Sequence, residues 1–407
     1  MSREINNSEY RQKMIRALLA QLHAGTSAEE VKAQFQAAFD GVSAQEIAQA
    51  ENELVAGGLD PAEIRKLCDI HASVFEGSVE EIHRQEDPAQ IPGHPVHTLK
   101  AENQALTELM ETVIRPRLEA YRKDANPGSL RALKEAFVPL QQLHIHYLRK
   151  ENVLFPYLEK HGITAPPKVM WGVDDDIRAL AKEAVLLLSA PDSGSQGVIN
   201  AVESTIRKAS EMIFKEENIL LPMLMETLTE EEWAKIAADS VEIGFCLIPP
   251  PPAFAPTQTP RAAQPVQADI PAPAVVLPTG QLQPGELSAM LNALPVDITF
   301  VDREDTVKYF SQGRERIFPR TASVIGRKVV NCHPPASVHI VEGILADFKA
   351  GRKDHEDFWL PLHGRYILIR YYAVRSPAGE YLGTLEVTQD IAPIQAITGE
   401  KRLVSNP

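Results

Sequence analysis

His146-Tyr-Leu-Arg-Lys-Glu-Asn-Val-Leu-Phe-Pro156 is the stretch that decides the fold, because most of its second half occurs again farther along the chain. The two copies, Glu151–Leu158 and Glu217–Leu224, share the pattern E-N-[VI]-L-[FL]-P-x-L. A bundle built from two related helix pairs would produce such an echo, with the prolines near equivalent helix ends. The repeat therefore predicts helices that are related in pairs.

Three breaks divide the long amphipathic segments around this repeat. They are Asn126-Pro-Gly128, Pro166-Pro167 and the Ser/Gly-rich loop at residues 189–197. Four helices with short connections are the simplest arrangement that fits these breaks. We therefore predict an up-down four-helix bundle over residues 85–246.

The region before the bundle carries three helix start signals. Ser27-Ala-Glu-Glu30, Ser43-Ala-Gln-Glu46 and Asp60-Pro-Ala-Glu63 each place a side-chain oxygen three residues before a Glu, which is the pattern of an N-terminal helix cap. Residues 1–84 are therefore expected to form a separate all-α helical domain.

The composition changes after the bundle. Residues 247–285 are rich in Pro, Ala and Gln, a composition that favours an extended chain, so we predict a proline-rich linker there. Beyond it the hydrophobic period shifts towards two at residues 298–302, 366–374 and 382–387, which predicts β-strands.

The turn signal Ser376-Pro-Ala-Gly379 lies between the last two of these segments and predicts an antiparallel hairpin. A helix is expected at about residues 336–350. Residues 286–398 are therefore predicted to be an α+β domain, with residues 399–407 as a tail.

Charge and cysteine usage limit the classes of function. The 407 residues include 41 Lys and Arg against 55 Asp and Glu, a formal net charge of -14, which disfavours binding to nucleic acid or anionic lipid. The three cysteines lie far apart, and neither a signal peptide nor an apolar run long enough for a membrane span is present. We predict a cytoplasmic protein without an integral membrane segment.

Histidines and glutamates concentrate on the first two bundle helices. Imidazole and carboxylate groups that converge from several helices are the ligands of a non-haem iron site. His97–Glu102 and His146–Glu151 are each five residues apart, so on a regular helix each pair reaches one metal only from the sides of the inward face. His144 and Glu151, seven apart, share a face more directly.

The first repeat, together with Lys215-Glu-Glu-Asn-Ile-Leu-Leu-Pro222, resembles the hemerythrin HHE cation-binding domain. The resemblance is to a bacterial branch of that family that joins three modules. A helical domain of unknown function, of the type numbered 438, comes first and is marked here by Leu22-His-Ala-Gly25 and Leu67-Cys-Asp-Ile-His71. A PAS domain comes last and is marked by Asn331-Cys-His-Pro-Pro335 and Leu385-Glu-Val-Thr-Gln-Asp-Ile391.

The resemblance implies that His97, His146, Glu151 and Glu216 are iron ligands in a mono- or dinuclear site. The third bundle helix departs from the family pattern, because Asp174 stands where a ligand histidine is expected. The repeat also aligns Met212 with His146, so a second imidazole is missing. A site that includes Asp174 would be rich in carboxylates and poorly suited to reversible dioxygen binding.

Other residues are predicted to be alternative ligands, or to form hydrogen bonds to the ligands. These are His94, His144, Glu102 and Glu217 in the bundle, and His23, Cys68 and His71 in the N-terminal domain. A polar core that is only hydrogen-bonded, without metal, is the competing interpretation for the whole set.

In the C-terminal domain, Cys332 and His333 precede the expected helix, near the place where PAS domains line a ligand pocket. A thiol or imidazole there could bind haem or a metal, or respond to oxidation. The alternative is a structural turn set by Pro334 and Pro335.

We found no nucleotide-binding, nucleophile-elbow or kinase motif in the sequence. The leading hypothesis is therefore a sensor of redox state, oxygen, nitric oxide or iron, with a non-haem iron bundle and a PAS domain that contacts an unidentified protein partner. A homodimer through the PAS domain is a further expectation. The alternatives are a non-haem iron enzyme that handles nitric oxide or repairs iron–sulfur clusters, and a metal-free scaffold.

Overall fold

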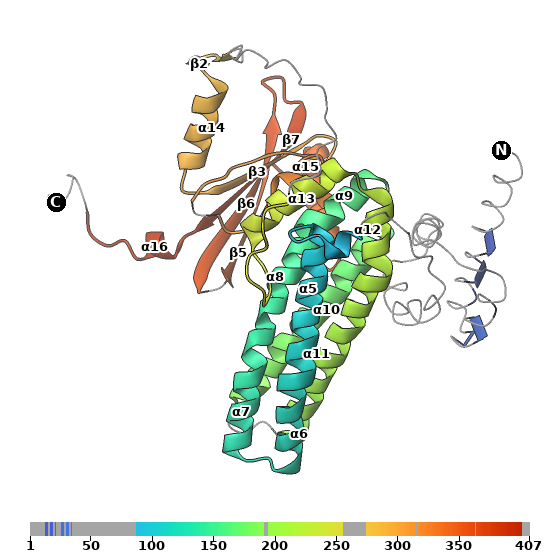
Figure 1. The fold of residues 1–407 in the computed structure, drawn as a ribbon. Helices are drawn as coiled ribbons and strands as arrows, with labels where there is room; N and C mark the ends of the chain where they lie inside the picture. The colour runs from blue at the N-terminus through green and yellow to red at the C-terminus, as the bar shows by residue number, and fades with distance from the viewer. Residues whose placement is uncertain are drawn as a thin grey trace, which may run out of the picture. The chain divides into compact units, whose positions relative to one another are not determined.

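The computed structural model describes residues 87–190, 194–254, 274–314, 316–362 and 364–400, with scattered positions between residues 13 and 34. The chain divides into two compact units, one that ends near residue 257 and one that follows it. Figure 1 shows the first unit as a bundle of long helices and the second as a sheet with helices.

Between residues 87 and 254, the described residues form a bundle of four long helical stretches and one shorter helix, which can be followed in Figure 1. Their segments are α5 (Pro95–Glu108), a π-helical turn (Leu109–Ile114) and α6 (Arg115–Lys123); α7 (Pro127–Phe137), α8 (Leu143–Arg149), a π-helical turn (Lys150–Leu154) and α9 (Phe155–Lys160); α10 (Ala165–Ser189); α11 (Ser195–Lys215), a π-helical turn (Glu216–Leu220) and α12 (Leu221–Thr227); and α13 (Glu230–Ile243). The predicted helical bundle is confirmed, with α13 added after the fourth stretch.

The breaks between helices follow the signals in the sequence. The Asn126 side chain accepts from the backbone of Gly128 and Ser129, and Pro127 takes the first helical position of α7. Thr229 and Glu232 form a reciprocal capping box at the start of α13. At Ser27 one of the two bonds of such a box is present, because the Ser27 Oγ accepts from the Glu30 N–H at 3.3 Å.

Both copies of the sequence repeat fold in the same way. Each contains a π-helical turn that ends two residues before its proline, Pro156 or Pro222, which then takes an early position of the next helix. The Asn152 side chain donates to the Leu148 carbonyl at 2.9 Å, and the Asn218 side chain donates to the Phe214 carbonyl at 2.8 Å. A π-helical turn changes which backbone N–H group each carbonyl accepts from. The side-chain amides of Asn152 and Asn218 each supply a donor to a carbonyl beside the altered turn.

The second unit contains a five-stranded antiparallel sheet in the order β4-β3-β7-β6-β5. Its elements are β3 (Asp297–Asp302), β4 (Val307–Phe310), β5 (His355–Leu362), β6 (Arg365–Arg375), β7 (Tyr381–Asp390), α14 (Pro284–Ala293), α15 (Val338–Lys349) and α16 (Ala392–Gln395). The predicted hairpin is confirmed, because β6 and β7 pair around Ser376–Gly379 with Ile369 opposite Thr388. The predicted helix is α15.

Both ends of the range predicted as a linker carry structure. A two-stranded hairpin, β1 (Val275–Leu277) and β2 (Gly280–Leu282), precedes α14. Residues 248–254 lie against the bundle, where Gly93 has a φ of 85° and an added Cβ would collide with the Pro252 carbonyl oxygen. Composition alone predicts an extended chain but does not show that an extended proline segment can pack on a helix end.

Within the described residues, no helix combines the length and apolar character that a membrane span requires.

Candidate functional site

The polar residues that meet inside the bundle come from all four long stretches. They are Glu102 on α5, His146 and Arg149 on α8, Lys150 and Glu151 on the π-helical turn that follows, Asp174 and Arg178 on α10, and Glu216 on the second π-helical turn. We call this set the charge network. All of its members except Arg178 are buried.

His146 lies at the centre of the charge network between two carboxylates. Its Nδ1 is 2.6 Å from Glu102 Oε2 and its Nε2 is 3.0 Å from Glu216 Oε2. Burial alone would lower the pKa of His146, but the Glu216 and Glu102 carboxylates outweigh it and raise that pKa to about 9. His146 is therefore an imidazolium at neutral pH, and both ring nitrogens donate.

Lys150 bonds to carboxylates on two other helical stretches, the third and the fourth. Its Nζ donates to Asp174 Oδ1 at 2.8 Å and to Glu216 Oε1, and its side chain is fully buried. Burial works against the charge, yet Asp174 and Glu216 raise the pKa of Lys150. The ammonium also lies 4.3 Å from the centre of the Tyr147 ring, a cation–π contact.

The two glutamates of this arrangement stay ionised despite burial. Burial raises the pKa of Glu216, but Lys150 and His146 bring it down to about 2. Burial likewise opposes the charge on Glu102, while His146 and Arg149 lower its pKa to about 2. Each of these carboxylates thus has two cationic partners.

Asp174 differs from these two glutamates. Burial raises its pKa well above the usual range, and Lys150 offsets only part of that effect. Its Oδ2 is buried and makes no hydrogen bond to any described residue. Asp174 therefore carries the unused acceptor of the charge network.

Arg149 ties the charge network to the segment after α13. Its Nη1 donates to Glu102 Oε1 at 2.8 Å and to the Gly244 carbonyl at 2.9 Å. The Cys246 N–H donates to the same Glu102 oxygen at 2.6 Å. The start of the proline-rich segment is therefore bonded directly to the bundle core.

Glu151 faces a different cation. Both of its oxygens accept from Arg178, each at 2.8 Å, and Arg178 also bonds to Asp175 at 2.9 Å. Burial raises the pKa of Glu151, and Arg178 opposes that shift. The Arg178 guanidinium lies 5.4 Å from the Tyr147 ring centre, so Tyr147 contacts cations from two helices.

The geometry does not fit a metal ion. Lys150 holds one oxygen each of Asp174 and Glu216, His146 holds the other oxygen of Glu216, and both nitrogens of His146 are already bonded. Among the described residues, no three His, Cys, Asp or Glu side chains are arranged to hold one ion. A metal here would have to displace the Lys150 ammonium.

The remaining predicted ligands lie outside these contacts. His97 is half-buried on α5, with a buried Nδ1 that has no hydrogen-bond partner among the described residues. His94 is buried as the cap of α5, and its ring lies 4.9 Å from that of Trp233. His144 and Glu217 are exposed. His23, Cys68 and His71 lie outside the described residues.

In the second unit, His333 lines a small cavity together with Tyr371 and Glu386, and burial lowers the pKa of His333. That cavity measures about 20 Å³, which is room for about one water molecule. This arrangement leaves no space in that cavity for haem. Cys332 is half-buried, with its Sγ 3.6 Å from the Lys328 carbonyl.

Sequence reasoning missed the cations of the charge network: Arg149, Lys150 and Arg178. A signal was present, because the repeat aligns Lys150 with Glu216, and opposite charges at equivalent positions can pair across a symmetric bundle. Arg178 had no comparable signal, since its bidentate bond to Glu151 depends on how α10 packs.

Three family models match successive parts of the chain. The family of unknown function DUF438 matches residues 15–81, the hemerythrin HHE cation binding domain matches residues 94–224, and a PAS domain matches residues 287–392. A search of curated proteins gives no match.

Among solved structures, the chain is similar to a C-terminal domain from Streptococcus mutans, at 32% identity over 31% of this chain and 97% of that one, with a TM-score of 0.29. It is also similar to the PAS domain of BvgS from Bordetella pertussis, at 22% identity over 26% of this chain and 84% of that one, with a TM-score of 0.23. A sensory box sensor histidine kinase from Vibrio cholerae matches at 13% identity over 26% and 87%, with a TM-score of 0.21. The domain assignment rests on the three family models and on the observed folds.

The bundle and the sheet thus define a multidomain protein in which a hemerythrin-type helical domain precedes a PAS domain. More particularly, the chain is a DUF438–hemerythrin HHE–PAS protein, with its three modules in that order. The hemerythrin and PAS matches support a sensor or signalling protein that carries a domain of a metal-binding family.

Proposed function

We propose that this chain is a signalling regulator whose hemerythrin-type bundle works through resident buried ion pairs instead of a bound metal. The single observation that carries the proposal is the position of Lys150, whose ammonium bonds to Asp174 and Glu216 inside the bundle. A cation supplied by the chain itself already compensates these carboxylates.

Buried ion pairs of this kind make a bundle sensitive to small changes. Removing one partner of a buried pair costs about 3–5 kcal/mol, because the other charge is left without compensation. The members also bond in series, from Arg149 through Glu102, His146 and Glu216 to Lys150. A change at one end can therefore alter the bonding at the other, and the PAS domain provides the second module for passing a signal to a protein partner.

The metal content of the full-length chain tests the leading proposal. Protein purified without air from iron-replete cells is analysed for iron, zinc and manganese, as wild type, Lys150→Ala and the control Lys182→Ala, whose lysine is exposed on α10. We expect wild type and control to carry no stoichiometric metal and to keep their melting temperature in chelator. Lys150→Ala is expected to gain stabilisation from added divalent cations. Stoichiometric metal in the wild type would contradict the proposal.

Signalling is tested in the source organism. A deletion strain is complemented with the wild type, with Lys150→Ala, or with a chain lacking residues 286–398, and its transcript response to oxygen and nitric oxide is compared. We expect both altered chains to lose the response that the wild type restores. A truncated chain that restores the full response would argue against a signalling role for the PAS domain.

A non-haem iron sensor or enzyme is the second candidate, and two observations favour it. Asp174 Oδ2 is buried without a bond to any described residue, and Glu216 lies on a π-helical turn, a feature that often occurs at functional sites. His146, Asp174 and Glu216 would be the ligands, after Lys150 had moved away. Stoichiometric iron with a visible spectrum that changes on exposure to oxygen or nitric oxide would support this candidate.

Three expectations from the sequence stay part of the proposal. They are a cytoplasmic location, an unidentified protein as the output partner, and a homodimer formed through the PAS domain. Size-exclusion chromatography with light scattering, on the full chain and on a chain without residues 286–398, tests the dimer directly.

A further inference from the structure

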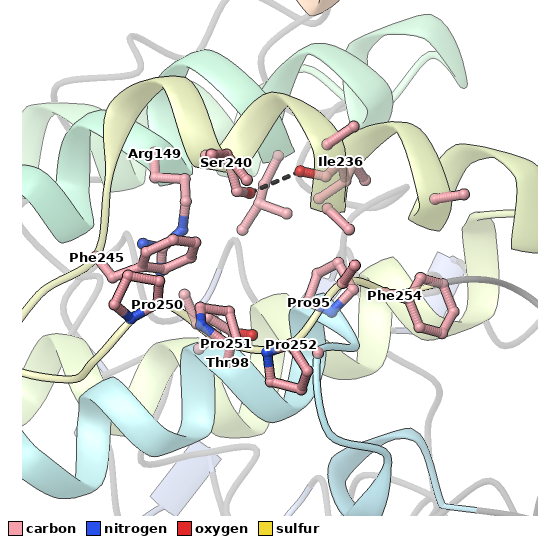
Figure 2. Close-up of a pocket in the computed structure, with 18 residues that line it drawn as sticks. Pro95, Thr98, Arg149, Ile236, Ser240, Phe245, Pro250, Pro251, Pro252 and Phe254 are labelled. Atoms are coloured by element: carbon pink, nitrogen blue, oxygen red, sulfur yellow. Dashed lines mark hydrogen bonds between the residues drawn. The ribbon is translucent and has the colours of Figure 1, made fainter.

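A pocket of about 310 Å³ lies between α5, α13 and the segment that follows α13. Figure 2 shows α13 along one side and Pro250, Pro251 and Pro252 along the other, with Arg149 and Phe245 together at one end. We call residues 245–254 the proline strap. The pocket volume is within the range of small-molecule sites, roughly 300–1,000 Å³.

The wall of the pocket is largely apolar. Leu99, Leu154, Ile236 and Val241 contribute aliphatic side chains, and the hydroxyls that line it are already used inside the protein. Thr98 Oγ1 donates to the His94 carbonyl, and Ser240 Oγ donates to the Ile236 carbonyl. A ligand would therefore bind mainly by burying apolar surface.

Arg149 is the exception, because it is a buried cation with donors left over. Its hydrogen bonds use Nη1 twice and Nη2 once, so Nε–H and one Nη2 hydrogen have no partner among the described residues. Its side chain is only 4% exposed. A carboxylate or similar anion at this end of the pocket would accept from these donors.

The proline strap is seated closely enough to act as one wall. The absence of a side chain at Gly93 lets the Pro252 carbonyl approach the start of α5, and the Phe254 ring lies 4.8 Å from that of His94. At its other end the strap is bonded to Glu102 through the Cys246 N–H. The strap therefore connects the pocket to the charge network.

We infer that this pocket is a binding site for a small apolar molecule that carries one carboxylate, with the carboxylate directed to Arg149. Its occupancy alters the bonds that Arg149 and the strap make to Glu102, and so links ligand binding to the charge network. The inference does not depend on whether the bundle holds a metal.

Isothermal titration calorimetry on the full-length chain tests the site with naphthalene-2-carboxylate as the probe. The matched probe is 2-naphthylmethylamine, which has a similar apolar body and the opposite charge. We expect the carboxylate to bind at least about tenfold more tightly than the amine. Equal affinities, or no heat of binding for the carboxylate up to its solubility limit, would overturn the inference.

Pocket-filling variants locate the binding. Ala237→Trp, or Ala234→Phe if the first variant melts early, is expected to weaken carboxylate binding by about tenfold or more. The control Ala179→Trp, at an exposed position on α10, is expected to bind as the wild type does. Unchanged affinity in a folded Ala237→Trp or Ala234→Phe variant would place the probe elsewhere and overturn the assignment. Arg149→Lys is expected to reduce the preference for carboxylate over amine.

Discussion

The two copies of the repeat have the same backbone structure, but they contribute side chains of opposite charge to the charge network. Both have a π-helical turn and an asparagine that bonds back to a carbonyl, followed by a proline in an early position of the next helix. The aligned residues Lys150 and Glu216 are both buried and bond to each other. The two copies therefore share their local structure but carry a cation and an anion at equivalent positions. The packing of the bundle brings these two side chains into contact.

The next aligned pair shows the opposite outcome. Glu151 is buried against Arg178, whereas Glu217 is exposed, although both begin the same motif. The difference comes from the neighbouring helices, because α10 supplies Arg178 beside the first copy. The shared motif thus determines the π-helical turn. The packing of neighbouring helices determines whether the glutamate of that turn, Glu151 or Glu217, is buried.

Lys150→Met is expected to produce the largest loss of stability. It leaves Asp174 and Glu216 without their shared cation, and the free energy of unfolding should fall by about 3–5 kcal/mol. Urea denaturation of the full chain measures the loss, with Lys182→Met as the exposed control. A loss no larger than that of the control would show that Lys150 does not compensate the charges of Asp174 and Glu216.

The second largest expected effect is the stabilisation that the charge on His146 provides, and this stabilisation depends on pH. The pKa of His146 is about 9 in the folded bundle against an ordinary 6.5, a difference worth roughly 3 kcal/mol. Because the folded pKa is raised, this stabilisation is fully present below pH 6.5 and is lost as the pH rises towards 9. His146→Gln should be less stable than wild type near pH 6, and the gap should narrow by pH 9. A gap that does not change between these two pH values would show that His146 is not an imidazolium.

Glu151→Gln and Glu217→Gln separate the two copies of the repeat most directly. The first change removes the charge from a bidentate bond to Arg178 and should cost about 1.5–3 kcal/mol, since charged hydrogen bonds contribute that much. The second alters an exposed side chain and should cost less than about 0.5 kcal/mol. Thermal melting of both variants gives the comparison, and equal shifts would mean that the two glutamates have the same environment.

Asn152→Ala and Asn218→Ala are expected to have small effects on stability that are similar to each other. Each removes one hydrogen bond to a carbonyl within a π-helical turn, worth about 1 kcal/mol. Chemical denaturation of the pair tests whether the two turns are equivalent in energy as well as in shape. A difference of more than about 1 kcal/mol between them would show that the local structure is not equivalent.

The order of elements could be predicted from the sequence because its signals are local. The caps at Asn126 and Thr229, the prolines at helix starts and the period-two pattern around Ser376–Gly379 each act within a few residues. The burial of His146, Glu151, Asp174 and Glu216 could also be anticipated, from their place on the inward faces and from the family resemblance.

The partners of these residues could not be predicted. On a regular helix each residue advances by about 100°, and the expected positions of His146 and Glu151 depend on that regularity. The π-helical turn at Lys150–Leu154 inserts an extra residue into the turn and changes which side chains share a face. The packing of α10 beside this turn then places Arg178 against Glu151, and both oxygens of Glu151 accept from that arginine.

The sequence by itself determined that helices, a repeat, a proline-rich segment and a hairpin would form, because backbone preferences and capping act over short distances. Only the tertiary structure decided that Lys150 lies between Asp174 and Glu216, and that His146 bridges Glu102 and Glu216. Those contacts join residues on different helices, and the balance between desolvation and ion pairing that keeps them charged exists only when the helices pack together.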